Sequence, residues 1–494
     1  MAGYNSSYGN IFKTTFLFGF VQVFNIIVKV ILNKFAALFL GAEGLGIIGI
    51  YNNVIRMIVT GAGLGINQSA VRDISEANST SDFNRFSIII SLVNRVIIFT
   101  AILGIIVTLL LSSLLSKLTF DNAQYTLSYI LLSLVVGFNI LTEGQHAILK
   151  GMRQLSSLAK ASMFGALVGL FIAVPFYYFY KNAGIIPSLI VTALSSLFFS
   201  NYYVRNINYS KIKLKLKEIF KESKPMIKMG IALMYVTFIG NIFETIVASY
   251  ISRVGSLADV GFYNAGVSII SGYFGIIITA MTTDYYPRIS AIYSNNDQLR
   301  IEMNKQAETG LIMIYPLVIL FVFLSPFFIE ILYSKAFFST NDYTDYAMIG
   351  TLFIVVSNCM GMILLAKQAS NIFIWSVLGQ RVFLICVYIY GYKYWGLTGL
   401  GLSYIVTGVL NFVLMNIILR HFYDIRIDKR VASLLCIVVI STICTIFVRK
   451  IDILFIKYLL GLGLLLVSIV FTYQYLRKVM NLDLLTFYRN RIRK

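Results

Sequence analysis

Apolar residues fill this chain in long segments that short polar stretches separate. Each segment holds about 20 mostly apolar residues, which is the length an α-helix needs to cross a bilayer. The longest polar connection is 205–228, so the pattern leaves no room for a soluble domain. The sequence therefore predicts an all-α integral membrane protein. Its fourteen expected spans are 12–33, 45–66, 87–111, 125–149, 158–180, 184–204, 229–251, 262–284, 310–333, 346–366, 371–392, 396–419, 432–448 and 453–476.

A short motif occurs twice, at the start of the second and of the eighth expected span. The first copy is Gly-Ile-Tyr-Asn-Asn at 49–53, and the second is Gly-Phe-Tyr-Asn-Ala at 261–265. Because an even number of spans separates the copies, both have the same orientation, as in the parallel repeats of many secondary transporters. We expect two six-helix bundles and two extra C-terminal helices. The expected parts are an N-terminal lobe at 1–205, a basic cytoplasmic linker at 206–228, a C-terminal lobe at 229–420, and two helices with a basic tail at 421–494.

Composition and charge agree with a membrane protein. The 494 residues are 58% hydrophobic and 13% charged, with a mean hydropathy of +0.81. The net charge of +20 would suggest nucleic-acid binding in a soluble protein. Here most Lys and Arg residues lie at the termini and in the loops after even-numbered spans. The positive-inside rule then predicts that both termini are cytoplasmic, and we expect no nucleic-acid partner.

Six charged residues lie inside the expected spans, where an ionised side chain is costly. A charge at mid-membrane costs about 2.5–3.5 kcal/mol on insertion scales, so it persists mainly where it faces a wet cavity or a partner. Four of the six are cations, which indicates an interior suited to an anionic ligand. The six are Lys29, Arg56, Arg95, Glu143, Glu244 and Arg381.

Two of these cations belong to polar stripes with helical spacing. The stripe of the first span is Gln22, Asn25, Lys29 and Asn33. The stripe of the second span is Asn52, Arg56, Thr60, Gly63 and Asn67. We interpret both stripes as cavity lining, because a guanidinium such as that of Arg56 matches phosphate oxygens. Two alternatives stay open: Lys29 extending to the membrane surface, and Arg56 bonding a neighbouring helix.

Two further cations are candidates by their depth alone. Arg95 lies close to the cytoplasmic end of the third expected span, where reaching the lipid headgroups is an equal alternative. Arg381 lies near the middle of the eleventh expected span, beside Gln380. We include Arg95 and Arg381 with Lys29 and Arg56 as candidate contacts to the anion.

The fourth expected span carries Glu143 and His146, one helical turn apart. Carboxylates inside membranes often take part in proton or ion relays, so this pair is a candidate for coupling to H⁺ or Na⁺. The alternative is charge balance, with Glu143 neutralising Arg56 or Arg95. The chain has only two histidines, and its four cysteines form no C-x-x-C pair, so we expect no metal site and no cofactor.

The seventh expected span carries Asn241 and, one turn later, Glu244. We expect Asn241 to line the cavity with Gln22, Asn25 and Asn52. Glu244 has two interpretations. It couples ions by pairing with Lys29 or Arg56 in one state of a transport cycle, or it forms a structural ion pair.

Several sequence segments resemble one branch of transport proteins. They are NIFKTTFLFGFVQVFNIIVKVILNKFAALFLG, GLGIIGIYNNVIRMI, GAGLGINQSAVRDIS and DVGFYNAGVSIISG. The chain resembles the polysaccharide-transporter branch of the multidrug/oligosaccharidyl-lipid/polysaccharide exporter superfamily, and within it the Wzx-type O-antigen or repeat-unit flippases. The resemblance implies two lobes around a V-shaped cavity in the bacterial inner membrane.

The resemblance also implies a substrate and a mode of action. The substrate would be an undecaprenyl-pyrophosphate-linked oligosaccharide that moves from the cytoplasmic to the periplasmic leaflet by ion-coupled alternating access. We expect a monomer among membrane lipids, in association with polysaccharide assembly proteins. The related lipid II flippases carry essential cations on helices one, two and eight. Lys29 and Arg56 match the first two, but no cation lies between Phe262 and Thr283, so Arg95 or Arg381 is the candidate replacement.

Two other functions remain as alternatives. A multidrug or cation antiporter on the same scaffold would need net acidic residues in the cavity, whereas cations dominate the interior here. A polysaccharide polymerase or ligase would need catalytic residues on sizeable periplasmic loops, and the expected loops on that side are short. We therefore expect a transporter and no enzymatic activity.

Overall fold

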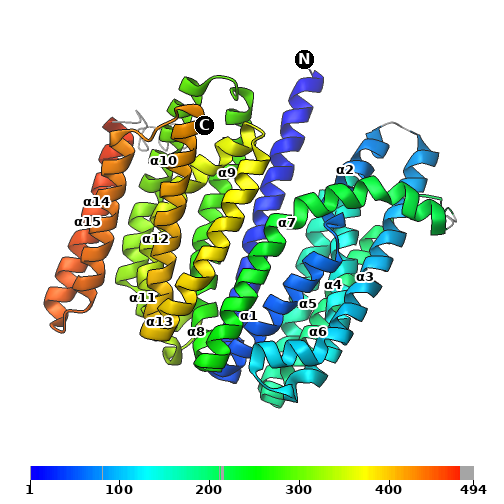
Figure 1. Ribbon diagram of the computed structural model, residues 1–494, viewed down its shortest axis with the longest axis horizontal. Helices are drawn as coiled ribbons and strands as arrows, with labels where there is room; N and C mark the ends of the chain where they lie inside the picture. The colour runs from blue at the N-terminus through cyan, green and yellow to red at the C-terminus, as the bar shows by residue number, and fades with distance from the viewer. Residues whose placement is uncertain (1, 80–81, 211, 213–215, 479–494) are drawn as a thin grey trace. The chain divides into compact units, whose positions relative to one another are not determined.

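The computed structural model describes residues 2–79, 82–210, 212 and 216–478, and its regular secondary structure over these residues is helical (Figure 1). The chain divides into two compact units. The first contains Met1–Gly261 with Leu332–Ser334, and the second contains Phe262–Ile331 with Lys335–Lys494. This division follows packing within each unit. The lobe and linker boundaries expected from the sequence repeat remain a prediction.

Among the described residues, the first unit contains seven complete α-helices and the first residues of an eighth. Their bounds are α1 Ala2–Ala62, α2 Ile66–Ser79, α3 Phe83–Phe120, α4 Thr126–Gly151, α5 Leu155–Tyr180, α6 Ile185–Arg205, α7 Leu216–Val254 and α8 Leu257–Val267. The second unit holds the rest of α8 and continues through a π-helical segment at Ser268–Phe274. Its further helices are α9 Gly275–Ala291, α10 Asn296–Phe323, α11 Ser325–Leu332, α12 Thr340–Ala366, α13 Ser370–Tyr423, α14 Lys429–Arg449 and α15 Leu454–Lys478.

Eleven helical segments among the described residues are long and apolar enough to cross a membrane. Three of them each hold two expected spans. They are Phe20–Ala62, which turns at Gly41, Leu155–Arg205, which contains the 3-10 turn Lys181–Gly184, and Asn371–Tyr423, which turns at Gly396. Gly41 and Gly396 have φ angles of 68° and 56°, which glycine adopts without the steric cost of a side chain. The prediction of an all-α membrane protein with about fourteen helices is confirmed.

Capping residues set where the third helix begins and ends. The Asp82 carboxylate accepts hydrogen bonds from the backbone N–H groups of Asn84 and Arg85, both at 3.0 Å, and so satisfies two donors that a helix start leaves unpaired. At the other end, Asp121 adopts a left-handed conformation and Lys117 lies in the last turn. These signals lie at the ends of the apolar run, so the sequence itself fixes the length of α3.

Glycines allow α7 to contact the junction between α1 and α2. Gly65 has a φ of +63°, and a Cβ built on it would lie 2.0 Å from the carbonyl oxygen of Gly230 in α7. A Cβ on Gly61 would meet the ring of Phe238 at 2.8 Å. Figure 1 shows α7 bending along its length, with one part near α2 and the remainder descending beside α1. The glycines of this junction therefore permit close helix packing.

The tyrosines of the repeated motif occupy equivalent core positions in the two units. Tyr51 is 2% exposed and meets the ring of Tyr129 on α4 edge-on, with centroids 5.6 Å apart. Tyr263 is 6% exposed and meets the ring of Tyr343 on α12 in the same manner, at 5.2 Å. Tyr51 and Tyr129 lie in the second and fourth expected spans. Tyr263 lies in the eighth, and Tyr343 lies on α12, the helix that holds the tenth, so both partners are shifted by six spans. The repeated tyrosine is therefore a core residue of each unit.

A buried ion pair joins α14 to α12 within the second unit. Arg449, at the end of α14, contacts both carboxylate oxygens of Asp345 on α12, and its Nη1 lies 2.7 Å from Oδ1. The two side chains are 10% and 6% exposed. The same guanidinium also donates to Ser325 and to the backbone of Val322. Five donors in a fixed fork allow one arginine to bond several neighbours in this way.

Candidate functional site

The first unit contains an ion pair between its first and seventh helices. Arg56 of α1 donates from Nη2 to Glu244 Oε2 of α7 at 2.9 Å, and to Asn53 Oδ1 at 2.5 Å. The side chain of Arg56 is 55% exposed and that of Glu244 is 43% exposed. Both charges therefore remain accessible while they are paired. The structure thus pairs Glu244 with Arg56, which is one of the two partners considered for this carboxylate.

The amide of Asn241 joins the same two helices one turn away from the ion pair. Its Nδ2 donates to Thr60 Oγ1 at 2.9 Å and to the backbone oxygen of Arg56 at 3.3 Å. Thr60 lies one turn after Arg56 in the polar stripe of α1, so the stripe faces α7. Two side chains of α7, Asn241 and Glu244, consequently meet two adjacent turns of α1.

Lys29 contributes a second cation near this ion pair. Its side chain is exposed, and it interacts electrostatically with both Arg56 and Glu244. Two cations and one carboxylate therefore form a cluster with one excess positive charge. Gln22, two turns before Lys29, is also exposed.

Asn25 connects the stripe of the first span to α5. Its Nδ2 donates to Ser162 Oγ at 3.0 Å. Its Oδ1 is buried and has no hydrogen-bond partner among the described residues. An amide oxygen without a partner is costly in a buried position, and this one borders a cavity that could hold water or a ligand group.

A cavity of about 500 Å³ collects these polar side chains. Its size lies within the range of about 300–1,000 Å³ that ligand pockets usually have. Helices α1, α4, α5, α6 and α7 all contribute to its wall. The polar lining includes Asn25, Arg56, Glu143, His146, Ser162 and Asn241. We refer to it below as the Arg56 cavity.

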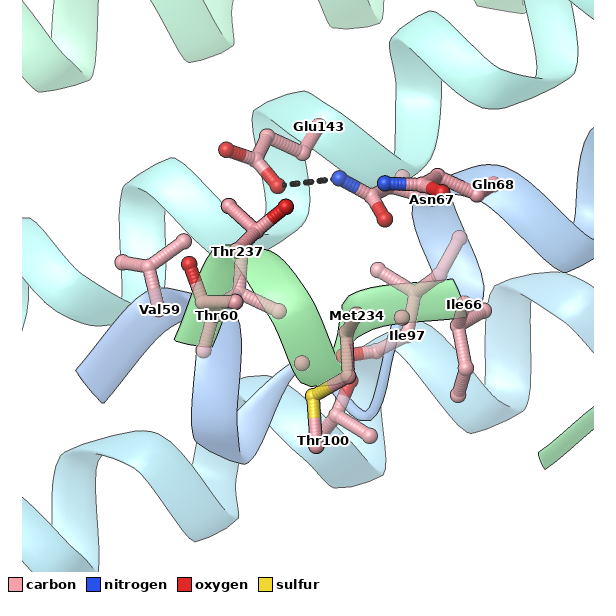
Figure 2. Close-up of a pocket in the computed structure, with 14 residues that line it drawn as sticks. Val59, Thr60, Ile66, Asn67, Gln68, Ile97, Thr100, Glu143, Met234 and Thr237 are labelled. Carbon is pink, nitrogen blue, oxygen red and sulfur yellow. Dashed lines mark hydrogen bonds between the residues drawn. The ribbon is translucent and has the colours of Figure 1, made fainter. Parts of the chain in front are cut away.

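A smaller cavity of about 150 Å³ lies next to the junction of α1 and α2. Figure 2 shows Glu143 of α4 and Asn67 of α2 pointing toward each other, with Thr237 of α7 beside them. Asn67 Nδ2 donates to Glu143 Oε2 at 2.7 Å. Both cavities are lined by Glu143 and Thr237. In the described part of the chain, Glu143 thus bonds an amide and interacts electrostatically with Lys150, and it has no ion pair with Arg56 or Arg95, the cations that charge balance suggested.

His146 lies one turn after Glu143 and bonds a different helix. Its Nε2 is 2.9 Å from Ser200 Oγ of α6. Both Glu143 and His146 line the Arg56 cavity, so α4 supplies two ionisable groups to its wall. Sequence reasoning singled out both residues but missed their partners. Single serines such as Ser162 and Ser200 are common in apolar helices and carry no signal of their own.

Gln22 and Lys29, which were expected to line the cavity, are not among its lining residues, and three other candidates do not line it either. Arg95 is exposed on α3 and lines neither of the two cavities, and Asn52 is exposed on α1 and also lines neither. Arg381 is half-buried in α13, within the second unit, and interacts electrostatically with Tyr404. Within the first unit, the structure therefore brings together Lys29, Arg56 and Glu244, and places Glu143 and His146 on the wall of the same cavity.

The fold is similar to that of several solved transporters. It matches a structure described as the lipid II flippase MurJ in an inward closed conformation, with a TM-score of 0.66, 14% identity, and coverage of 94% of this chain and 100% of the other. It matches an inward-facing multidrug resistance MATE family transporter of the MOP superfamily with a TM-score of 0.63, 15% identity, and coverage of 84% and 95%. It also matches the Vibrio cholerae MATE transporter VcmN in its bent form, with a TM-score of 0.55, 12% identity, and coverage of 89% and 99%.

Sequence comparison gives the family. A search of curated proteins found no match. The family described as "Polysaccharide biosynthesis protein" matches residues 35–341, which include Arg56, Glu143 and Glu244. At these identities the solved structures show a shared fold of multi-pass membrane transporters, and the family match covers more than half of the chain. The chain therefore belongs to the Polysaccharide biosynthesis protein family and has the fold of the MOP-superfamily transporters.

Proposed function

We propose that this protein is a flippase that moves an undecaprenyl-pyrophosphate-linked oligosaccharide from the cytoplasmic to the periplasmic leaflet of the bacterial inner membrane. The observation that carries the proposal is the cluster of Lys29, Arg56 and Glu244 beside the Arg56 cavity. Arg56 is paired with Glu244 there, Lys29 interacts electrostatically with both, and all three side chains are at least partly accessible. A cluster with excess positive charge suits a pyrophosphate better than it suits a cationic drug.

Arg56 is the main proposed contact to the pyrophosphate. Its guanidinium presents several donors in one plane, a geometry that allows bidentate bonds to phosphate oxygens. One of its terminal nitrogens now bonds Asn53 and Glu244. An arriving pyrophosphate would compete with Glu244 for this donor, and Lys29 would add a second positive charge at the same place.

The competition offers a route to ion coupling. Glu244 released from Arg56 is an accessible carboxylate without its counter-charge, which makes it a candidate site for the coupling ion. Return of Glu244 to Arg56 would expel that ion as the pyrophosphate leaves. Glu143 and His146, on the wall of the same cavity, are the next candidates for such a relay. Alternating access would then be driven by the ion gradient.

The family and the fold support a lipid-linked saccharide. The family description names polysaccharide biosynthesis, and one protein of similar fold is described as a lipid II flippase. A hydrophilic saccharide crosses a membrane with its lipid carrier only if a protein shields the polar part. We propose cytoplasmic termini on the positive-inside rule, and O-antigen or a related surface polysaccharide as the product.

Deletion and complementation test this function. A deletion strain of the source bacterium should lose surface polysaccharide, and the wild-type gene should restore it. Lys29→Ala and Arg56→Ala should each fail to restore it at normal protein levels in the membrane. Lys117→Ala, which removes an exposed cation from the last turn of α3, is the matched control and should complement fully. Full export by both cavity variants would exclude a role of these cations in transport.

A further inference from the structure

A third and larger cavity lies elsewhere in the first unit. Its volume is about 830 Å³, and its wall is formed by α3, α4, α6 and residues 207–210, which follow α6. None of its lining residues lines the Arg56 cavity. The proposed transport function makes no use of it. We call it the α6 pocket.

The α6 pocket has a polar side made of amides, a phenol and one cation. Gln145 of α4 donates from Nε2 to Asn201 Oδ1 of α6 at 3.3 Å. Asn94 of α3 donates from Nδ2 to the Tyr209 hydroxyl at 3.3 Å. Arg205, the last residue of α6, is exposed and has no ion pair or hydrogen bond among the described residues. Helices α3, α4 and α6 and residues 207–210 thus all contribute polar groups to the wall of this pocket.

One of these groups lacks a partner. The Oε1 atom of Gln145 is buried and accepts no hydrogen bond from any described residue. Buried amide oxygens are almost always bonded, because an unpaired one loses its water without compensation. This atom therefore points to a ligand or a water with a donor group, such as a hydroxyl, in the pocket.

An apolar stripe leads along α4 to the pocket. Its members are Leu127, Leu131, Leu134, Phe138 and Leu141, spaced so that they share one helix face, and Gln145 ends the same face. Leu127, Leu131 and Leu134 are exposed. On α3, Ile98 borders the pocket and is 50% exposed. One occupant could therefore lay hydrocarbon along α4 and place a polar group in the pocket.

Two residues of the pocket wall lie at the ends of candidate membrane spans. Arg205 ends the candidate span Leu155–Arg205, and Phe83, another wall residue, begins the span Phe83–Phe120. The ends of spanning helices lie at the membrane–water interface, where arginine and tyrosine side chains meet headgroups. A soluble ligand would use the polar side alone and leave the apolar stripe without a role.

We propose that the α6 pocket binds an anionic phospholipid with a hydroxyl-bearing headgroup, of the phosphatidylglycerol class. Arg205 holds the phosphodiester by a charge-assisted hydrogen bond. A headgroup hydroxyl donates to Gln145 Oε1, which needs a donor that the phosphate itself does not have. One acyl chain lies along the stripe on α4.

The bound lipid would brace the start of the segment between α6 and α7. Tyr209 is joined to α3 through Asn94, and the backbone N–H of Ser210 donates to Ser87 Oγ at 3.1 Å. Asn94, Tyr209 and Ser210 all line the α6 pocket. The site therefore connects lipid composition to the segment that leads into α7, the helix that carries Glu244.

Thermal unfolding of the purified full-length protein in detergent tests the proposal. Added dioleoylphosphatidylglycerol should raise the unfolding temperature at lower concentration than dioleoylphosphatidylcholine does. Arg205→Gln should raise the phosphatidylglycerol concentration needed by about tenfold, the loss expected for one charge-assisted hydrogen bond. Arg205→Lys should restore part of the effect. Arg420→Gln is the matched control, because Arg420 is an exposed arginine in the last turn of α13, and it should behave as wild type.

A second variant tests the headgroup contact without changing charge. Gln145→Leu should reduce the advantage of phosphatidylglycerol over phosphatidic acid, which has no headgroup hydroxyl, and should leave the unfolding temperature without lipid close to that of wild type. The Gln145→Leu measurement tests the proposal even where Arg205→Gln folds poorly. Inorganic phosphate or a soluble oligosaccharide that stabilises the protein as well as phosphatidylglycerol does would overturn the choice of a phospholipid.

Equal responses of wild type and Arg205→Gln to phosphatidylglycerol would also overturn the proposal. None of these measurements depends on transport, so the lipid site and the flippase function can fail separately.

Discussion

Glu244 of α7 lies 2.9 Å from Arg56 of α1, although 188 residues separate them in the sequence. The pair is accessible rather than buried, with side chains 43% and 55% exposed. Exposed ion pairs contribute only about 0.2–1 kcal/mol, so this one can be exchanged for a ligand at small cost. It is therefore better suited to a changing site than to holding α7 in place.

Removing the charge of Glu244 should strengthen anion binding. Glu244→Gln keeps the shape of the side chain but no longer competes as an anion for Arg56. We expect the affinity of the purified protein for inorganic pyrophosphate to rise about two- to fivefold, which corresponds to the energy of an exposed ion pair. Isothermal titration calorimetry measures it. Glu43→Gln, which changes an exposed carboxylate elsewhere on α1, is the control. Weaker binding by Glu244→Gln would contradict the competition.

A side chain at Gly65 should destabilise the first unit. Gly65→Ala forces a non-glycine residue to a φ of +63° and brings its Cβ against the backbone of α7. The strained conformation alone costs about 1–3 kcal/mol, and the clash adds to it. We expect a lower unfolding temperature in detergent. Gly240→Ala, on α7 with open space around its Cβ, should be neutral or stabilising, as expected for alanine in a helix.

Breaking the buried ion pair of the second unit should be costly. Arg449→Met leaves the Asp345 carboxylate buried without its partner, which typically costs about 3–5 kcal/mol. Thermal unfolding measures the loss. Adding Asp345→Leu to the same protein should recover much of it, since no unpaired charge then remains. Arg426→Ala, which removes an exposed pair with Asp424, should change stability by less than about 1 kcal/mol. Similar losses for the two arginines would show that Arg449 does not clamp α14.

The two repeated tyrosines should be equally important for stability. Tyr51→Ala and Tyr263→Ala each empty a core position that an edge-on aromatic contact fills. Truncation of a large buried aromatic residue costs about 3–5 kcal/mol. We expect comparable drops in unfolding temperature for both. Tyr390→Ala, at a position 61% exposed, is the control and should have little effect. A large effect at only one of the two positions would show that the repeated tyrosines do not have equivalent roles in the stability of the two units.

The sequence predicted the spans well because bilayer thickness dictates the length of an apolar helix. Hydropathy did not predict the turns at Gly41 and Gly396, because such turns depend on backbone angles that hydropathy does not encode. The partners of the charged residues were harder to predict from the sequence. Glu244 was assigned two possible partners, and its distance from Arg56 selects one. Glu143 bonds Asn67 because the break between α1 and α2 turns that asparagine toward α4, a consequence of tertiary packing that spacing along one helix does not reveal.

The α6 pocket escaped sequence reasoning for a related reason. Its amides lie singly on α3, α4 and α6 and form no stripe on any one helix. Gln145 could have been noticed, because it ends an apolar face of α4 that is otherwise uniform. One polar residue at the end of a lipid-facing stripe is a weak signal until the neighbouring helices are placed.

The contact between Gly65 and Gly230 restricts how α7 can move. Each glycine leaves less space than a Cβ requires, so the residues on either side of Gly230 cannot take its place. Turning α7 about its own axis by one residue would bring Met229 or Ile231 onto the backbone at Leu64 and Gly65, and sliding it by about one turn would bring Met226 or Met234 there. Sliding α7 by a turn and turning it about its own axis are therefore both blocked, whereas tilting α7 about this contact leaves Gly230 in place. The contact between Gly65 and Gly230 is therefore a pivot point for α7. The length of helix between Gly230 and Glu244 is fixed, and it sets the position of Glu244 along α7 relative to Arg56.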